Sequence, residues 1–212
     1  MQKLTGVALL FITSIATLSS CTKDPLKDMT EDESRIYITN HDSTANFTSY
    51  KTYSLVDSVS LIDNGRFAGR EATSLDVQFT TAIASAMNAR GFTRVDRTQN
   101  PDLGITVSRV YNTSTNVVNL GDYYGGYGSY YDPYYWGYGG YGYYFPDAYG
   151  VYQSTEALLS TDILDLKNAP STGKIRGIWN GTIRGEGIFN TNNVQSGVQA
   201  LFDQSPYLKT TR

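Results

Sequence analysis

The stretch STDILDLKNAPSTGKIRGIWNGTIRG, from Ser160 to Gly185, decides the fold class. Its first half predicts a strand that ends near Leu166, and Ala169–Gly173 predicts a hairpin turn. In its second half, apolar side chains recur on one face and polar side chains on the other: Ile175, Trp179 and Ile183 against Arg176, Asn180 and Arg184. Because a short turn joins neighbouring strands in antiparallel fashion, the stretch predicts an antiparallel pair with Trp179 in the core.

Two amphipathic helices accompany this hairpin. The first is predicted over residues 74–90, with Thr73 as N-cap, Asp76 in the first turn and Gly91 as the stop. Its apolar face consists of Leu75, Phe79, Ala82, Ile83, Ala86 and Met87. The second helix is predicted near the C-terminus, with Asn193 as its cap. Its apolar stripe consists of Val194, Val198, Leu201 and Phe202. Each helix can therefore cover one face of a sheet.

The remaining patterns complete an α+β domain. Runs of β-branched and aromatic residues predict further strands at 35–40, in the second half of 46–56, from 92 onward and at 103–111. Residues 65–69 are interpreted as a loop, and Arg109 is the exception on an otherwise apolar strand face. The predicted order is β-β-α-β-β-insert-β-β-α. It corresponds to an antiparallel sheet of about six strands with two helices packed on one face.

The N-terminus carries the signature of a lipoprotein signal peptide. Lys3 precedes the apolar run Leu4–Leu18, which is short of the ~20 residues that span a bilayer. The run ends in LSSC, which resembles a bacterial lipobox and predicts cleavage before Cys21 and lipidation of that residue, the only cysteine. Residues 1–20 are then the signal peptide, and residues 21–34 are a lipidated N-terminus and tether. The implied location is the outer membrane of the cell envelope, on its periplasmic or outer side.

Composition and motifs predict no catalytic, metal-binding or cofactor-binding residue. The net charge of −3 and the absence of a basic patch argue against nucleic acid as a partner. The one histidine, His41, lacks neighbouring His or Cys, whereas zinc sites need three or four ligands. Asp162 and Asp165 lie three apart on a strand, so they should point to opposite faces as solvated residues beside the turn. Ser171–Lys174 lacks the first Gly of a phosphate loop and is interpreted as a type I turn.

Residues 121–150, GDYYGGYGSYYDPYYWGYGGYGYYFPDAYG, form an insert of unusual composition. Twelve of the thirty residues are Tyr and nine are Gly. Three interpretations stay open: a mobile loop, a recognition surface for glycan or protein, or a segment that folds over the sheet. Tyr offers a large amphipathic surface at low entropic cost, as binding loops use it. The candidate ligand contacts are Tyr130, Tyr131, Tyr134, Tyr135 and Trp136.

Several segments together resemble the DUF4136 family of bacterial envelope lipoproteins, and TKDPLKD after the lipobox resembles the export signal of Bacteroidetes lipoproteins. These segments are NFTSYKTYSL, the helix that ends in ARGF, NPDLGITV, the Ser160–Gly185 hairpin and VQALFDQSP. The resemblance implies a single α+β domain over residues 35–208 and an envelope location, and it implies no catalytic residues. The function expected is that of a non-enzymatic, lipid-anchored envelope protein with a structural or accessory role. The alternative is a glycan- or protein-binding module that uses the insert. The expected partners are the membrane, through the N-terminal lipid, and an envelope glycan or protein.

Overall fold

The computed structural model describes residues 29–64, 66–111, 117–119, 132–145, 151–153 and 157–211. The chain divides into two compact units, residues 1–34 and residues 35–212. The described part of the first unit contains the short helix α2 (Glu31–Ser34). The predicted signal peptide and Cys21 lie outside the described residues, as do residues 121–131 and 146–150 of the insert.

The second unit contains both strands and helices. Its elements are β1 (Ile36–His41), the 3-10 helix η1 (Phe47–Ser49), β2 (Thr52–Leu55), β3 (Val59–Asp63), β4 (Arg66–Glu71), α3 (Ser74–Ala89), β5 (Thr93–Arg94), η2 (Arg97–Gln99), β6 (Leu103–Tyr111), β7 (Val117–Asn119), η3 (Pro133–Trp136), β8 (Gly142–Tyr144), β9 (Val151–Gln153), β10 (Leu158–Asp165), α5 (Ala169–Thr172), β11 (Lys174–Arg184), η4 (Thr191–Asn193) and α6 (Val194–Asp203).

These strands form a mixed sheet that is larger than predicted. Within the described residues, nine strands join one sheet, whose main path is β1-β11-β10-β6-β2-β5, and β7 pairs with β9 separately. The centre, β1-β11-β10-β6, is antiparallel as expected, but β2 and β3 both pair with β6 in parallel. The prediction of about six antiparallel strands was therefore too small and too uniform, although the α+β class is confirmed.

Two of the strands that the sequence did not predict form a hairpin, and it includes the segment interpreted as a loop. β3 and β4 pair antiparallel around a tight turn in which Asn64 adopts a left-handed conformation, with φ of 45°. Asn tolerates this region better than most residues. The glycines at 65 and 69 suggested a loop, but Gly69 lies within β4, where its φ is +140°.

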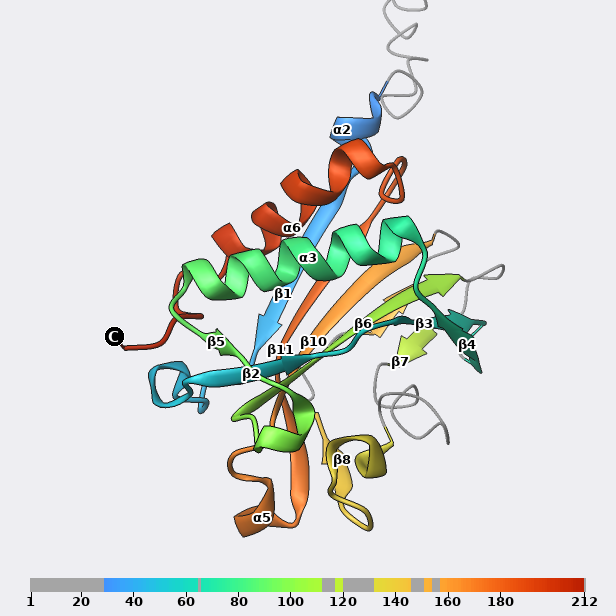
Figure 1. The fold of residues 1–212 in the computed structure, drawn as a ribbon. Coiled ribbons are helices and arrows are strands. Elements are labelled where there is room, and N and C mark those ends of the chain that lie inside the picture. Colours follow the sequence, from blue (N-terminus) through green and yellow to red (C-terminus); the bar gives the residue numbers. More distant parts are fainter. Residues whose placement is uncertain are drawn as a thin grey trace, which may run out of the picture. The chain divides into compact units, whose positions relative to one another are not determined.

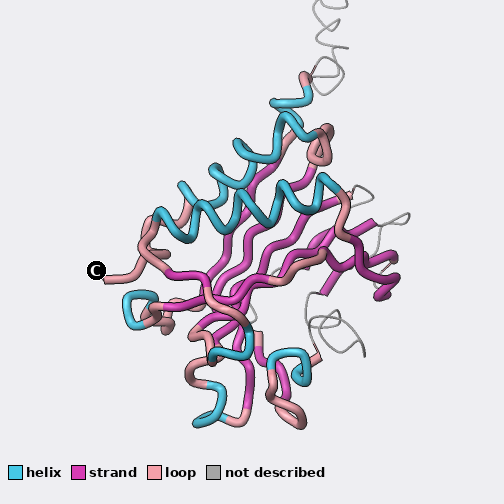
Figure 2. The backbone as a smooth tube through the Cα atoms, viewed as in Figure 1, coloured by secondary structure: helices cyan, strands magenta, loops and turns pink. Residues whose placement is uncertain are grey.

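The two long helices lie on the same face of the sheet, as predicted (Figures 1 and 2). Trp179 of β11 is fully buried beneath them, and its indole Nε1 donates to Ser205 Oγ over 2.8 Å. Its ring centroid lies 5.6 Å from that of Phe202 of α6. The core position predicted for Trp179 is confirmed.

The start of α3 explains the arginine on the apolar face of β6. Thr73 caps α3 as predicted, and Asp76 completes a capping box, with its Oδ2 accepting from the Thr73 backbone N–H over 2.9 Å. Asp76 is only 1% exposed, and its Oδ1 lies 3.1 Å from Nε of Arg109. Arg109 also pairs with Glu71. A buried charge needs such partners, so Arg109 joins the helix N-terminus to the sheet.

The cap of the C-terminal helix differs from the prediction. Asn193 makes no side-chain cap bond, because η4 runs directly into α6 and Asn193 already has helical dihedral angles. Its side-chain Nδ2 donates instead to the Gly187 carbonyl over 3.0 Å, and Asn190 caps η4. The apolar stripe of α6 is buried as expected: Val194, Val198, Leu201 and Phe202.

Candidate functional site

Part of the Tyr/Gly-rich insert is built into the domain. Asp132 caps η3, with its Oδ1 accepting from the Tyr134 N–H over 3.0 Å, and Gly137 ends the turn with a φ of 84°. Downstream, β8 pairs in parallel with residues 174–176 of β11. It fills the place beside β11 beyond the end of β1, which pairs only with residues 179–184 (Figure 1). Residues 132–145 thus follow the third interpretation, in which the insert folds onto the sheet.

Glycines of the sheet accommodate the aromatic rings of this segment. Trp136 is 6% exposed and packs on Gly104 of β6. A Cβ added at Gly104 would lie 3.0 Å from the indole ring and 3.1 Å from Leu166 Cδ1. Gly177 of β11 leaves room for the Phe145 ring in the same way. The absence of side chains at these two positions is therefore what lets the aromatics reach the backbone.

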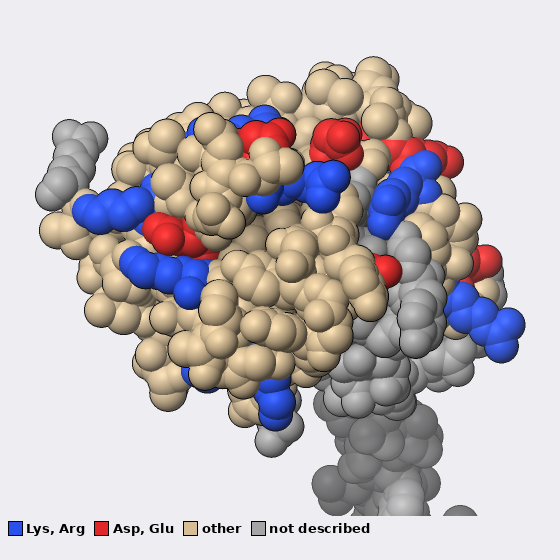
Figure 3. Space-filling view, turned by 60° about the horizontal axis from the view of Figure 1, so that its bottom comes forward, with Lys and Arg blue, Asp and Glu red and all other residues tan. Residues whose placement is uncertain are grey.

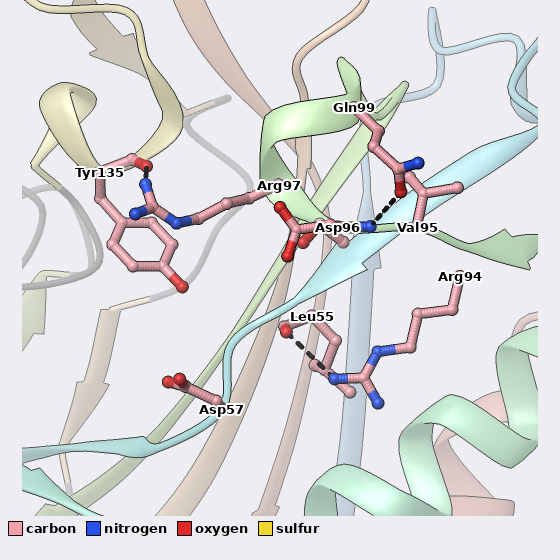
Figure 4. Close-up of a pocket in the computed structure, with 9 residues that line it drawn as sticks. Leu55, Asp57, Arg94, Val95, Asp96, Arg97, Gln99 and Tyr135 are labelled. Atoms are coloured by element: carbon pink, nitrogen blue, oxygen red, sulfur yellow. Dashed lines mark hydrogen bonds between the residues drawn. The ribbon is translucent and has the colours of Figure 1, made fainter.

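Two guanidinium groups lie close to the Tyr135 ring. Arg97 Nη1 donates to the Tyr135 carbonyl over 2.9 Å, and the Arg97 guanidinium lies 5.0 Å from the centre of the ring (Figure 4). Arg70 of β4 lies 5.9 Å from the same ring. Both distances are within the range of cation–π attraction. The insert is thereby fixed to η2 and β4, which come from distant parts of the sequence.

Two hollows share Arg97 and Tyr135 in their linings, and we call them together the Tyr135 groove. One has a volume of about 480 Å³ and the other a volume of about 350 Å³. The charged residues that line it are Asp57, Arg94, Asp96 and Arg97 (Figure 4). Two acidic and two basic side chains leave no net charge. Figure 3 shows acidic and basic side chains interspersed on the face that it presents.

The predicted ligand contacts differ in how accessible they are. Tyr134 is 74% exposed, with its ring lying over Gly139. Tyr135 is half-buried, Trp136 is buried, and Tyr130 and Tyr131 lie outside the described residues. A further exposed aromatic that the sequence did not single out is Tyr144, at 45%. Among the described members of the predicted set, Tyr134 is therefore the residue that presents its ring to solvent.

The two aspartates of the hairpin are buried, so the expectation that both are solvated is wrong. Asp162 is 0% exposed and accepts from Asn180 Nδ2 over 2.7 Å. Asp165 is 4% exposed and accepts from the Tyr50 hydroxyl over 2.9 Å. Both lie in an unbroken register with β6, so they point to opposite faces as predicted. They cannot converge on one substrate.

A β-bulge changes the faces of the second hairpin strand. Ile163 pairs with Trp179 but Leu164 pairs with Gly177, so Ile178 of β11 has no partner in this ladder. The extra residue reverses the alternation. Arg176 therefore lies on the face of Asp165 and Trp179, whereas Ile175 lies on the opposite face, contrary to the simple alternation predicted.

Other residues singled out by the sequence have structural surroundings. The exposed His41 stacks on Tyr207, with ring centroids 4.0 Å apart. Residues 169–172, in the predicted hairpin turn, form the short helix α5. Gly173 ends it with a φ of 65°, so Ser171–Lys174 does not form the predicted type I turn. Within the described residues, no three His, Cys, Asp or Glu side chains are grouped to hold a metal ion. No helix within the described ranges is both long and apolar enough to cross a bilayer.

The residues that sequence reasoning missed are those brought to the groove by the fold. Arg94 lies in β5 and Arg97 in η2, and Arg70 lies in the unpredicted strand β4. These arginines are far from Tyr135 in the sequence, so no local sequence pattern connects them with it. A lone arginine in a polar segment carries no local signal for a ring more than thirty residues away.

Comparison with known proteins places this fold in a family. Residues 38–207 match the model of DUF4136, described as a domain of unknown function. A crystal structure of a DUF4136 family protein from Bacteroides thetaiotaomicron is similar, with 28% identity and a TM-score of 0.69. The match covers 84% of this chain and 99% of that chain. The comparison with curated proteins finds no match.

Two further structures are more distant. A PDZ domain protein from Parabacteroides distasonis has 13% identity and a TM-score of 0.44, covering 83% of this chain and 37% of that chain. The PelC dodecamer from Paraburkholderia phytofirmans has 10% identity and a TM-score of 0.40, covering 84% of this chain and 99% of that chain. Similarity at this level supports no inference about function here.

Proposed function

The chain belongs to the DUF4136 family, and we propose that it is a lipid-anchored, non-enzymatic accessory protein of the cell envelope. The observation that carries this proposal is the LSSC sequence at Leu18–Cys21, which follows an apolar run too short to span a bilayer. A compact unit begins soon afterwards, at residue 35. Lipid chains on Cys21 would hold that unit at a membrane, since two or more chains anchor stably.

The arrangement of the carboxylates supports a non-enzymatic role. Asp162 and Asp165 face opposite sides of β10, and each already accepts hydrogen bonds from neighbouring side chains. A general acid–base pair would need both groups to reach one substrate. Under this proposal the polar side chains of the hairpin stabilise the sheet, and the domain acts by binding or by position.

Replacement of the lipidated residue tests the anchor. The full chain with Cys21→Ser should leave the membrane fraction and keep its signal peptide, because the acceptor sulfur is gone. Ser20→Ala is the matched control, since a small residue at that position should preserve processing. Membrane partitioning and intact mass report the result. If Cys21→Ser cells retain the protein in membranes at the mature mass, the proposal is wrong.

A second candidate function is recognition of a glycan or protein partner by the insert. The exposure of the Tyr134 ring, on the same short helix η3 as Tyr135 of the groove, favours it, since exposed aromatic rings suit adhesive contacts. Tyr134→Ser should then abolish retention on an immobilised glycan array or in an envelope pull-down. Val77→Ser, at a comparably exposed apolar residue on α3, should leave retention unchanged.

A further inference from the structure

A second polar cleft lies apart from the Tyr135 groove and shares no lining residue with it. It lies between residues 42–50, α5 and the first residues of β11, and its volume is about 410 Å³. That size is within the ~300–1,000 Å³ of typical small-molecule sites. Its lining brings Asp42 together with Asp165 and Arg176, a cross-strand pair of the β10–β11 hairpin. We call it the Asp165 cleft.

Asp165 is buried here with acceptor capacity left over. Its Oδ1 accepts from the Asn168 N–H over 3.0 Å. Its Oδ2 accepts from the Tyr50 hydroxyl over 2.9 Å and from Asn168 Nδ2 over 2.8 Å. A carboxylate offers about four acceptor positions, so these bonds leave about one. Burial, followed by the neighbouring Asp165 charge, raises the pKa of Tyr50, which keeps this phenol protonated as the donor.

Asp42 has a similar surplus. Its Oδ1 accepts from the Thr44 N–H over 2.9 Å and from the Thr44 hydroxyl over 2.6 Å, while Oδ2 pairs with Arg176. The residue is only 6% exposed. Burial acts to raise the pKa of Asp42, but the Thr44 hydrogen bonds and the Arg176 charge outweigh it and hold that pKa below its usual value. The carboxylate is therefore ionised at neutral pH.

Arg176 adds donors and an aromatic neighbour. Its hydrogen bonds to Asp42 and Thr44 both come from Nη2, out of five N–H groups that a guanidinium carries. About a third of its side chain is exposed. The guanidinium also lies 5.5 Å from the ring centre of the exposed Tyr144, which brings β8 of the insert next to this arginine.

The balance of these groups selects a class of ligand. Two carboxylates against one guanidinium leave a net negative charge, which disfavours anions in a partly buried site. Spare acceptors and spare donors in one cleft suit a hydroxyl group, which both donates and accepts. We propose that the Asp165 cleft binds an uncharged, hydroxyl-rich ligand, that is, a neutral saccharide. This proposal depends neither on the lipid anchor nor on the Tyr135 groove.

The test uses the full chain purified in detergent and an array of immobilised neutral, uronic-acid-containing and amino-sugar oligosaccharides. The wild type should be retained on neutral oligosaccharides. Ser171→Tyr fills the cleft from its exposed rim and should abolish retention, whereas Ser85→Tyr on the exposed side of α3 should not. Arg176→Lys keeps the charge but loses the planar fork of donors, so binding should weaken at least tenfold.

Several outcomes would overturn the proposal. They are no retention of the wild type on any neutral oligosaccharide, preferential retention on uronic acids, and equal retention of wild type and Ser171→Tyr. Tyr134→Ser separates the two sites, because it should leave binding in the Asp165 cleft intact. Loss of binding in Tyr134→Ser, with Ser171→Tyr unaffected, would assign the ligand to the Tyr135 groove instead. Thermal unfolding of each variant should stay cooperative and close to the wild type.

Discussion

The chain has two tryptophans, and both are buried, but for different reasons. Trp179 lies on a regular strand beneath the helices, is 0% exposed, and has a hydrogen bond from its indole to Ser205. Trp136 lies in the Tyr/Gly-rich insert, is 6% exposed, and packs on a residue that has no side chain, Gly104. Trp179 is buried because the alternation of its strand points it toward the helices. Trp136 is buried because Gly104 of β6 has no side chain and leaves space for the indole ring. A low-complexity composition therefore does not by itself indicate a loop without tertiary contacts.

The largest loss of stability is expected at Trp179, the tryptophan of the regular strand. Trp179→Ala should reduce the free energy of unfolding by about 3–5 kcal/mol, the usual cost of truncating a core aromatic. Trp136→Ala should cost less, roughly 2–3 kcal/mol, because the surrounding insert can close part of the cavity. Urea unfolding measures both. Equal losses would show that the insert is as rigid a part of the core as the helices.

The next prediction concerns Gly104, whose lack of a side chain makes room for Trp136. Gly104→Ala should destabilise the domain by about 1–3 kcal/mol, since its Cβ would lie 3.0 Å from the Trp136 ring and the core has little space to give. Gly142→Ala is the matched control, because a Cβ there has no neighbour within 4 Å. In a Gly104→Ala variant that also carries Trp136→Ala, the added cost should shrink. An unchanged cost would mean that the strain arises elsewhere, for instance at Leu166.

Alkaline pH should affect both regions through their tyrosines. Burial raises the pKa of Tyr50 and Tyr53 in the domain, and of Tyr138 and Tyr143 in the insert. The folded state therefore favours the neutral phenol. Its contribution to stability is complete below the unfolded pKa of about 10 and is lost as pH rises past that value.

Phenolate absorbance followed together with circular dichroism across this range checks the alkaline prediction. Ionisation of these tyrosines should coincide with unfolding. Tyr50→Phe and Tyr138→Phe should each flatten the pH dependence, one for each region. A folded protein in which all tyrosines titrate freely near pH 10 would contradict the expectation.

The smallest effect concerns the attachment of the insert to η2. Arg97→Gln removes the stacking on Tyr135 and the hydrogen bond to its carbonyl, and should cost about 0.5–1 kcal/mol. Arg66→Gln, at an exposed position of β4, provides the control. Should Arg97→Gln cost nothing, the position of Tyr135 would depend on Trp136 and β8 alone.

Sequence reasoning succeeded where the period of the side chains is regular. The capping box of α3, the stripe of α6 and the core position of Trp179 follow from spacing alone. It failed where one residue breaks the period. Ile178 in the bulge moves Ile175 to the other face, and Asn64 turns a segment interpreted as a loop into the β3–β4 hairpin.

The candidate site was less predictable than the fold. The sequence indicated the insert as the place for ligand contacts, but it did not indicate which of its aromatic side chains are exposed and which are buried. Trp136 is covered because Gly104 leaves space, whereas Tyr134 stays exposed although its ring lies over Gly139. Those partners are matched through tertiary packing, which has no period along the chain. The burial of Asp165 depends in the same way on Tyr50, a residue from the other end of the domain.

The neighbouring position of β1 and β11 has a consequence for how the protein matures. β1 is the first strand of the domain, and its hydrogen-bonding partner β11 is the last (Figure 1). A chain that emerges from the ribosome or a translocation pore with its N-terminus first must hold β1 unpaired until β11 has appeared. Pairing over such a separation is slow, because the entropy of closing the long loop is lost before the contacts form. Premature release of a truncated chain would therefore leave an open strand edge ready to join another chain.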